Sequence, residues 1–268
     1  MASIQLMKES WNILKKDKEL MLYPLVSGII VLMLFVSVFI PVFFTTAAGT
    51  VANNYLIASF MIFYVLAAIV SVFFTASLIG AANMRFNGKD PKFSDGIKIA
   101  SKHLPKLIIW ALINATVGLL LRALSEGNNI IAKIISYIIS LAWSLLTLFT
   151  IPVILFEKKG SIASIKRSGE IFVKTWGESV IGQFSIGALF GLGLLAGIGL
   201  LILTLMTGMF ILFAVMFVLV AFGLIILYLI TSALNGIYIT ALYNYATHKK
   251  LPKGFSKEFI ESAFLRKK

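Results

Sequence analysis

The apolar stretch at residues 179–247 reads SVIGQFSIGALFGLGLLAGIGLLILTLMTGMFILFAVMFVLVAFGLIILYLITSALNGIYITALYNYAT, and none of its 69 residues is Asp, Glu, Lys, Arg or His. A second stretch of 65 residues without these side chains covers positions 20–84. The hydrocarbon core of a bilayer is about 30 Å thick, so one helical crossing takes roughly 20 residues. Each stretch is therefore too long for one crossing and predicts two crossings joined by a turn.

The composition of the whole chain is typical of an integral membrane protein. Hydrophobic residues make up 59% of the 268 positions, charged residues make up 13%, and the mean hydropathy is +0.97. Both charge-free stretches have basic segments at both ends, which requires an even number of crossings in each. We therefore predict an all-α membrane protein with six transmembrane helices arranged as three hairpins. The predicted spans are 21–45, 55–84, 107–125, 131–156, 180–206 and 209–246.

The basic residues indicate one orientation of these spans. Of the 24 Lys and Arg residues, 22 lie before span one, between spans two and three, between spans four and five, or after span six. Only Arg122 and Lys133 lie on the other side. The positive-inside rule then predicts a multi-pass protein of the cytoplasmic (inner) membrane with both termini in the cytoplasm. Orientation and anionic lipid explain the net charge of +13, so nucleic acid binding is not predicted.

A sequence repeat precedes the hairpins. SIQLMKESWNILKK (3–16) and SIASIKRSGEIFVK (161–174) share six identities in fourteen gapless positions, and FSDGIKIASKHLPK (93–106) fits the same frame more weakly. Apolar residues recur at helical spacing in these segments while Lys and Glu fill the other positions. Each segment predicts a cytoplasmic, interfacial amphipathic helix before its hairpin. We expect a single transmembrane domain over 1–268, with pseudo-repeats at 1–90, 91–160 and 161–250 and a C-terminal amphipathic surface helix at 254–265.

The amphipathic helices predict contact with lipid headgroups. Such helices lie in the interface with their apolar face in the membrane and their lysines near the phosphates. In the helix at 161–174 the apolar face would carry Ile162, Ile165 and Phe172. The alternative is that these helices are simple connectors that lie flat because the loops are short. The predicted headgroup contacts are Lys8, Trp11, Lys15, Lys16, Lys98, Lys102, Lys106, Lys166, Arg167, Lys174 and Trp176.

Small and polar residues within the spans suggest packing contacts. Two glycine pairs in span five have the spacing at which helix backbones approach closely, and they predict contacts on two sides of that span. The pairs are Gly187 with Gly191 and Gly193 with Gly197. Asn114, Gln183 and Asn235 are predicted to form hydrogen bonds between helices, or alternatively to line a solute pathway. No span carries an ionised residue at its centre, as an ion-coupled transporter usually would.

Catalytic and metal-binding motifs are not evident in the sequence. It contains no cysteine, which excludes disulfides, thiolate metal sites and Cys nucleophiles. His103 and His248 have no acid near them in the sequence, so they are weak candidates for metal or acid–base chemistry. HExxH, GxSxG and P-loop patterns are missing. We therefore expect no enzymatic activity, no cofactor and no metal.

Two segments resemble a known family. SWNILKKDKELMLYPLVSG (10–28), followed by a span, and RSGEIFVKTWGESV (167–180) resemble an uncharacterised family of prokaryotic six-span integral membrane proteins. More loosely, the arrangement is similar to the membrane domain of some glycerophosphodiester phosphodiesterases. The resemblance implies the fold and the topology, and it implies no activity.

These patterns lead to one functional hypothesis and two alternatives. We expect a non-enzymatic polytopic protein that acts as a lipid-contacting scaffold or as an accessory subunit of a membrane assembly. Its partners would be anionic membrane lipids and either copies of itself or another membrane protein. The alternatives are a transporter or channel for a lipid-like or weakly polar solute, and a membrane domain that serves a separate soluble enzyme.

Overall fold

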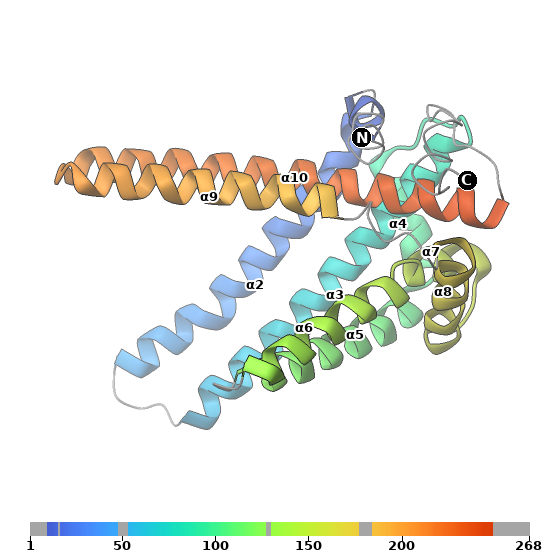
Figure 1. Cartoon of the computed structure of the whole chain (residues 1–268), viewed down its shortest axis with the longest axis horizontal. Helices are drawn as coiled ribbons and strands as arrows, with labels where there is room; N and C mark the ends of the chain where they lie inside the picture. Colours follow the sequence, from blue (N-terminus) through green and yellow to red (C-terminus); the bar gives the residue numbers. More distant parts are fainter. Residues whose placement is uncertain (1–9, 16, 48–52, 127–129, 177–183, 249–268) are drawn as a thin grey trace.

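The computed structural model describes residues 10–15, 17–47, 53–126, 130–176 and 184–248, and every regular element among them is helical (Figure 1). The predicted all-helical class is therefore confirmed for the described part of the chain. The elements are the 3₁₀-helix η1 (Lys18–Met21), α2 (Leu22–Ala47), α3 (Asn53–Phe86), α4 (Phe93–Ser101), α5 (Leu104–Ser125), α6 (Ile130–Leu146), α7 (Thr150–Pro152), the π-helix η2 (Val153–Glu157), α8 (Ser161–Trp176), α9 (Phe184–Met206) and α10 (Phe210–His248).

Several of these helices have the length and apolar composition of membrane spans. Five stretches are long and apolar enough to cross a membrane, and each coincides with one of the predicted spans. The remaining predicted span, 180–206, coincides with α9, in which the apolar stretch Phe190–Met206 is shorter. The five stretches are Lys18–Thr45, Tyr55–Phe86, Leu104–Ser125, Ile130–Glu157 and Phe210–His248.

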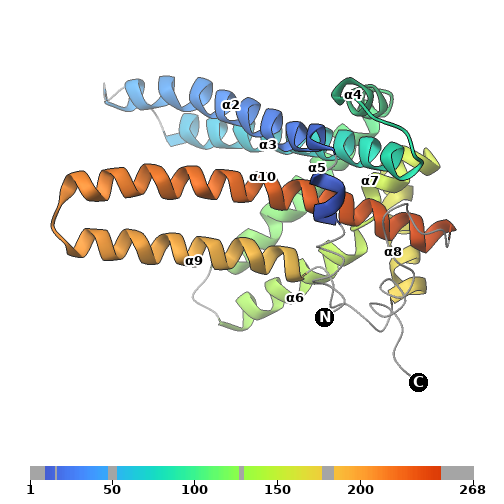
Figure 2. The same ribbon diagram turned by 90° about the horizontal axis from the view of Figure 1, so that it is seen from above.

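The helices pair in chain order as three hairpins. α2 packs against α3, α5 against α6, and α9 against α10. α3 is the central helix, because it also contacts α4, α5 and α10. In Figure 1 the α9/α10 hairpin diverges from the other two hairpins, and in Figure 2 it extends toward the same side as α2 and α3, from an end of the molecule where α4, α7, α8 and the end of α10 gather. At the tip of the α9/α10 hairpin Gly208 has a φ of +69°, a conformation that glycine adopts without strain.

Most of the buried apolar side chains lie at the end where the hairpins meet. We call this cluster the basal core. α10 has a buried part and an exposed part. Its residues from Thr231 to Tyr243 are mostly buried in this cluster, whereas its first half is exposed along the hairpin. The larger side chains of the basal core are Ile13, Leu14, Leu20, Tyr23, Phe74, Leu78, Phe86, Phe149, Val153, Ile171, Leu234, Ile237, Tyr238, Leu242 and Tyr243.

Two glycines permit close helix contacts in this region. A Cβ on Gly96 of α4 would lie 2.5 Å from the carbonyl oxygen of Ser77 in α3, and it would also overlap the hydroxyl of Tyr23. A Cβ on Gly236 of α10 would lie 2.8 Å from Cγ of Leu78. Since real Cβ atoms do not approach other atoms this closely, α4 can pack on the α3 backbone in this way only with glycine at position 96, whereas a side chain at position 236 would require Leu78 to move.

The predicted span 131–156 coincides with the apolar stretch Ile130–Glu157, but the helix is interrupted within it. α6 ends at Leu146, a turn follows, and the chain re-enters helix at Thr150. The proline at position 152 explains the break, because it has no N–H to donate to the carbonyl of residue 148 and its ring clashes with that turn. The N–H of Phe149 donates instead to Oγ of Ser168 in α8, at 2.9 Å. The break thus becomes a contact between the fourth predicted span and α8.

The face of α8 that packs on the rest of the protein is formed largely by serines. On α8 the buried face is formed by Ser161, Ser164, Ser168 and Ile171, whereas Ile162 is 74% exposed. The face of α8 that packs on the hairpins is thus built mainly from small serines, which permit close packing, and Ile162 of the predicted apolar face lies away from that contact. Ile165 and Phe172 are half-buried against the protein.

One position of the repeat is small and fully buried in all three segments. Ser10, Ala100 and Ser168 occupy the same place in the aligned frame, and each has an exposure of 0%.

The predicted C-terminal surface helix at 254–265 lies outside the described residues.

Candidate functional site

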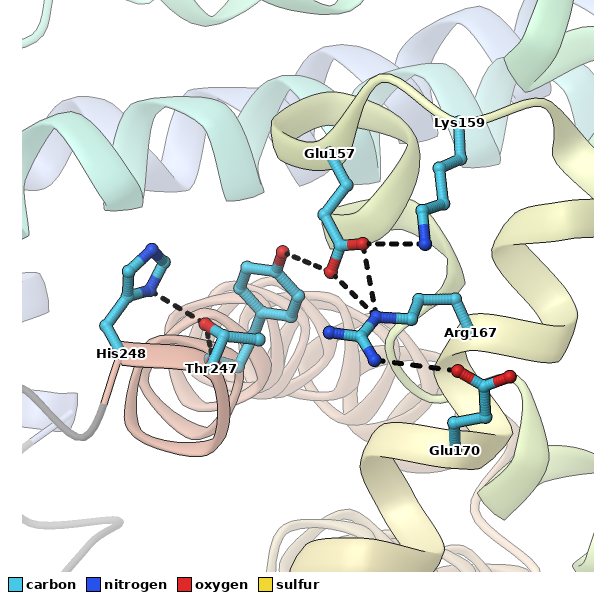
Figure 3. A network of polar contacts seen from close by, with 7 residues as sticks. Glu157, Lys159, Arg167, Glu170, Thr247 and His248 are labelled. Carbon is cyan, nitrogen blue, oxygen red and sulfur yellow. Dashed lines mark hydrogen bonds and ion pairs between the residues drawn. The ribbon is translucent and has the colours of Figure 1, made fainter.

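A network of charged side chains lies beside the basal core (Figure 3). Glu157, at the end of η2, accepts hydrogen bonds from Nε of Arg167 at 3.1 and 3.2 Å, one to each carboxylate oxygen. Its Oε2 also lies 3.1 Å from Nζ of Lys159, and its Oε1 accepts a hydrogen bond from the hydroxyl of Tyr243 at 3.2 Å. The guanidinium of Arg167 lies 3.5 Å from a carboxylate oxygen of Glu170. The network therefore joins η2, α8 and α10.

The surroundings of Glu157 suit a role in holding helices together better than a role as a catalytic base. Both oxygens of Glu157 are already engaged by donors, and its side chain is only 21% exposed. The hydrogen bond from Arg167 to Glu157 raises the pKa of the guanidinium above its usual value, although partial burial opposes this. The pair thus stays ionised and neutralised within the protein.

A second group of charges lies where η1 meets the end of α3. The carboxylate of Asp17 is buried, and one of its oxygens lies 4.0 Å from Nε of Arg85. Arg85 also forms an ion pair of 2.5 Å with the exposed Asp90. Burial raises the pKa of Asp17 and the positive charge of Arg85 opposes the shift, so the long ion pair compensates only part of the desolvation.

Hydrogen bonds fasten the start of α4 to the first hairpin. The N–H of Phe93 donates to a carboxylate oxygen of Glu19 at 2.6 Å, and the hydroxyl of Tyr23 donates to the carbonyl of Phe93 at 3.0 Å. Between α3 and α10, the amide of Asn244 donates to Oδ1 of Asn83 at 2.9 Å. Together with the Glu157 network, these bonds connect the three hairpins through polar side chains at the same end of the molecule.

The structure separates the residues predicted for a solute pathway. Asn114 accepts a hydrogen bond from Nε1 of Trp143 at 3.0 Å within the α5/α6 hairpin, which is the helix-bridging role. Asn235 is exposed on α10, and Gln183 lies outside the described residues. Trp143 also stacks on Trp110, with ring centroids 6.2 Å apart. The polar residues therefore do not form one shared site in the described part of the chain.

The glycines of α9 that contact another helix do so on the side facing α10. A Cβ on Gly193 would overlap the side chain of Leu227, and one on Gly197 would lie 2.9 Å from Cγ1 of Val220. Gly191 has no such neighbour within 4 Å, so it makes no second contact within this chain. Next to these glycines is an open groove of about 500 Å³ between α9 and α10, lined only by glycine, alanine, methionine, valine, leucine and isoleucine.

The predicted headgroup contacts have different surroundings. Lys98, Lys102, Lys166 and Lys174 are exposed, as is Lys15, whose ammonium lies 5.4 Å from the ring centroid of Trp11. Lys106 donates to the carbonyl of Lys158, and Arg167 is held by Glu157 and Glu170. Lys8 and Lys16 lie outside the described residues, and so does the side chain of Trp176. Gly187 lies in α9, where its surroundings are not described.

No cluster of three potential metal ligands occurs among the described residues. Nδ1 of His248 lies 2.7 Å from the hydroxyl of Thr247 (Figure 3). Burial is the main cause that lowers the pKa of His103. The positive charges of three lysines lower this pKa further, with Lys106 contributing most, then Lys158 and then Lys102. Both histidines thus have neighbours other than the acids that metal or acid–base chemistry would require.

Sequence reasoning missed the central acid of the site. Glu157 is the acid at the end of the fourth predicted span, and this position is the only signal that the sequence offers for it. Arg167 was predicted to contact lipid, and Tyr243 was not singled out. Glu157 and Tyr243 lie 86 positions apart, so their contact depends on how two hairpins pack.

Comparison with known proteins gives one match. The family model described as "Family of unknown function (DUF6159)" matches residues 51–253. The match extends from the α2–α3 connection to just beyond α10, so it includes the Glu157 network. The expected resemblance to an uncharacterised family is confirmed at that level. The comparisons with curated proteins and with solved structures found no match.

Proposed function

The chain belongs to the DUF6159 family of unknown function, and we propose that it is a non-enzymatic integral membrane protein that serves as a scaffold or accessory subunit. It crosses the membrane six times as three hairpins, and both termini lie in the cytoplasm. The distribution of basic residues supports this orientation, because 22 of the 24 lie on one side of the six spans. Its partners are anionic lipids and a second copy or another membrane protein.

The uncovered α9/α10 hairpin is the observation that carries this proposal. α9 packs on α10, and no other described helix makes comparable contact with α9. Leu203 and Leu219 are 63% and 58% exposed, and Gly199 and Gly223 have no neighbour within 4 Å of an added Cβ. Small residues on an exposed apolar helix allow a further helix to approach closely within a bilayer. A partner helix in the membrane would complete the packing that this hairpin lacks.

Single cysteines test the proposal, because the natural chain has none. Leu219→Cys lines the groove between α9 and α10. We expect this variant to form crosslinked dimers, or crosslinks to one membrane protein, when native membranes are treated with a thiol crosslinker. Leu120→Cys on α5 is the matched control, because residue 120 is apolar and 65% exposed on another hairpin.

The crosslinked fraction, measured on denaturing gels, should be several-fold higher for Leu219→Cys than for Leu120→Cys. Equal and low crosslinking at both positions would mean that lipid alone covers the α9/α10 hairpin. That result would remove the support for a scaffold.

One observation favours transport as a second candidate function. The fourth predicted span is interrupted between Leu146 and Thr150, and the hydroxyls of Thr150 and Ser164 are buried without a hydrogen-bond partner among the described residues. Interrupted spans with unsatisfied polar groups occur at the binding sites of transporters. A solute pathway predicts that Asn114→Cys reacts with a membrane-impermeant maleimide, whereas a dry interior predicts no labelling. Both variants are labelled in inside-out vesicles, where the matched control Asn87→Cys, in an exposed loop on the proposed cytoplasmic side, faces the reagent and should react in both cases.

A further inference from the structure

Four basic side chains from two segments of the chain gather beside the start of α5. Lys102 and His103 connect α4 to α5, Lys106 lies in the first turn of α5, and Lys158 follows η2. Nζ of Lys106 donates to the carbonyl of Lys158 at 2.5 Å. The hydroxyl of Ser161 donates to the carbonyl of Lys106 at 2.7 Å. These bonds hold the two segments together.

Among the described residues, no carboxylate forms an ion pair with any of these four side chains. Burial and the charges of Lys106, Lys158 and Lys102 all lower the pKa of His103, and no carboxylate contributes. Glu157 precedes Lys158 in the chain, but its oxygens are engaged by Lys159, Arg167 and Tyr243. Lys102 and Lys158 are exposed, so their ammonium groups are accessible to an anion.

The position of the cluster indicates which anion it binds. Leu104 begins one candidate membrane span, and Glu157 ends another, so the cluster lies at the level where two apolar spans leave the hydrocarbon. Two large apolar side chains beside the lysines are exposed, Leu104 at 37% and Ile162 at 74%. A phospholipid presents a negative phosphate directly above its acyl chains, and it therefore matches both features.

We propose that Lys102, Lys106 and Lys158 bind the phosphate of an anionic phospholipid in the inner leaflet, with its acyl chains against Leu104 and Ile162. This inference rests on the proposed insertion into the membrane. It gives the lysines of the α5 and α8 segments one shared ligand, whereas the sequence predicted separate contacts along each surface helix.

Native mass spectrometry of the full chain, with phosphatidylglycerol and phosphatidylcholine supplied in equal amounts, tests the site. The variant Lys102→Gln/Lys106→Gln/Lys158→Gln should retain phosphatidylglycerol about tenfold less than the natural chain, since each lysine near an anionic surface contributes to binding. The control Lys18→Gln/Lys89→Gln/Lys92→Gln removes the same charge from three other exposed lysines on the predicted cytoplasmic side. Its retention should stay within about twofold of the natural value if the effect is local.

A third variant separates folding from binding. Lys102→Gln/Lys158→Gln leaves the Lys106 side chain and its bond to the backbone intact, so it should unfold at the natural temperature and still lose most of the phosphatidylglycerol. Equal losses in the two triple variants would overturn the proposal in favour of general surface charge. Displacement of the lipid by millimolar glycerol phosphate would overturn it in favour of a soluble anion.

The scaffold proposal fails independently of this site. If lipid retention depends on the three lysines but Leu219→Cys does not crosslink, the lipid site stands and the scaffold does not. The reverse pattern, crosslinking without selective lipid retention, leaves the scaffold and removes the lipid site.

Discussion

Replacing Gly96 by alanine is expected to destabilise the protein by about 2 kcal/mol, because overpacking costs up to about 3 kcal/mol and the better helix propensity of alanine returns about 1 kcal/mol. The added methyl would lie 2.5 Å from the carbonyl oxygen of Ser77. That oxygen belongs to the backbone of α3 and cannot rotate away. The hydroxyl of Tyr23 is on the same side and is tied to Phe93, so α4 itself must move.

The measurement is the midpoint of thermal unfolding in detergent, followed by tryptophan fluorescence. Gly28→Ala is the matched control, because Gly28 also lies in a helix and has no atom within 4 Å of an added Cβ. The control should be unchanged or up to about 1 kcal/mol more stable, since only helix propensity changes there. Similar midpoints for Gly96→Ala and Gly28→Ala would show that α4 does not pack on α3 as described.

Glu157→Ala is expected to have an effect of similar size, about 2 kcal/mol, at the junction of the hairpins. It leaves Arg167 and the hydroxyl of Tyr243 without their acceptor, and a hydrogen bond to a charged group contributes about 1.5–3 kcal/mol. The loss is smaller than the sum of these hydrogen-bond contributions, because the side chains of Arg167 and Lys159 are 36% and 41% exposed and can hydrogen-bond to water instead.

An exposed ion pair of the same length provides the control. Arg122 and Glu126 are 3.1 Å apart, as are Arg167 and Glu157, but their side chains are 77% and 66% exposed. Glu126→Ala should therefore cost under about 1 kcal/mol. If both substitutions shift the unfolding midpoint equally, the Glu157 network contributes no more than a surface pair.

A double-mutant cycle shows whether Glu157 connects the hairpins. Tyr243→Phe removes only the hydroxyl that reaches Glu157, and it should cost about 1 kcal/mol. If the two residues interact, adding Tyr243→Phe to Glu157→Ala should cost clearly less than Tyr243→Phe does alone. Additive losses would mean that the contact between η2 and α10 does not contribute to stability.

The sequence was sufficient to predict the helices, because the signal for a span is local. A run of apolar residues must be helical in lipid, and its length follows from the bilayer thickness. The last span was predicted at 209–246, and α10 covers Phe210–His248. The third was predicted at 107–125, and α5 begins only three residues earlier, with Pro105 in its first turn. The fourth was predicted at 131–156 and the apolar stretch covers Ile130–Glu157, but its interruption was not predicted, since hydropathy takes no account of what Pro152 does to the preceding turn.

The arrangement of the helices could not be derived in the same way. Hydropathy is summed along the chain, whereas the site consists of residues from different hairpins. The acceptor role of Glu157 depends on Arg167 and Tyr243 lying on its two sides, and the buried serines of α8 depend on which face meets the hairpins. Composition, apolar run length and the distribution of lysines therefore determined the fold class and the expected orientation. Only the tertiary structure decided which polar side chains meet and which hairpin stays uncovered, because those contacts join positions far apart in the chain.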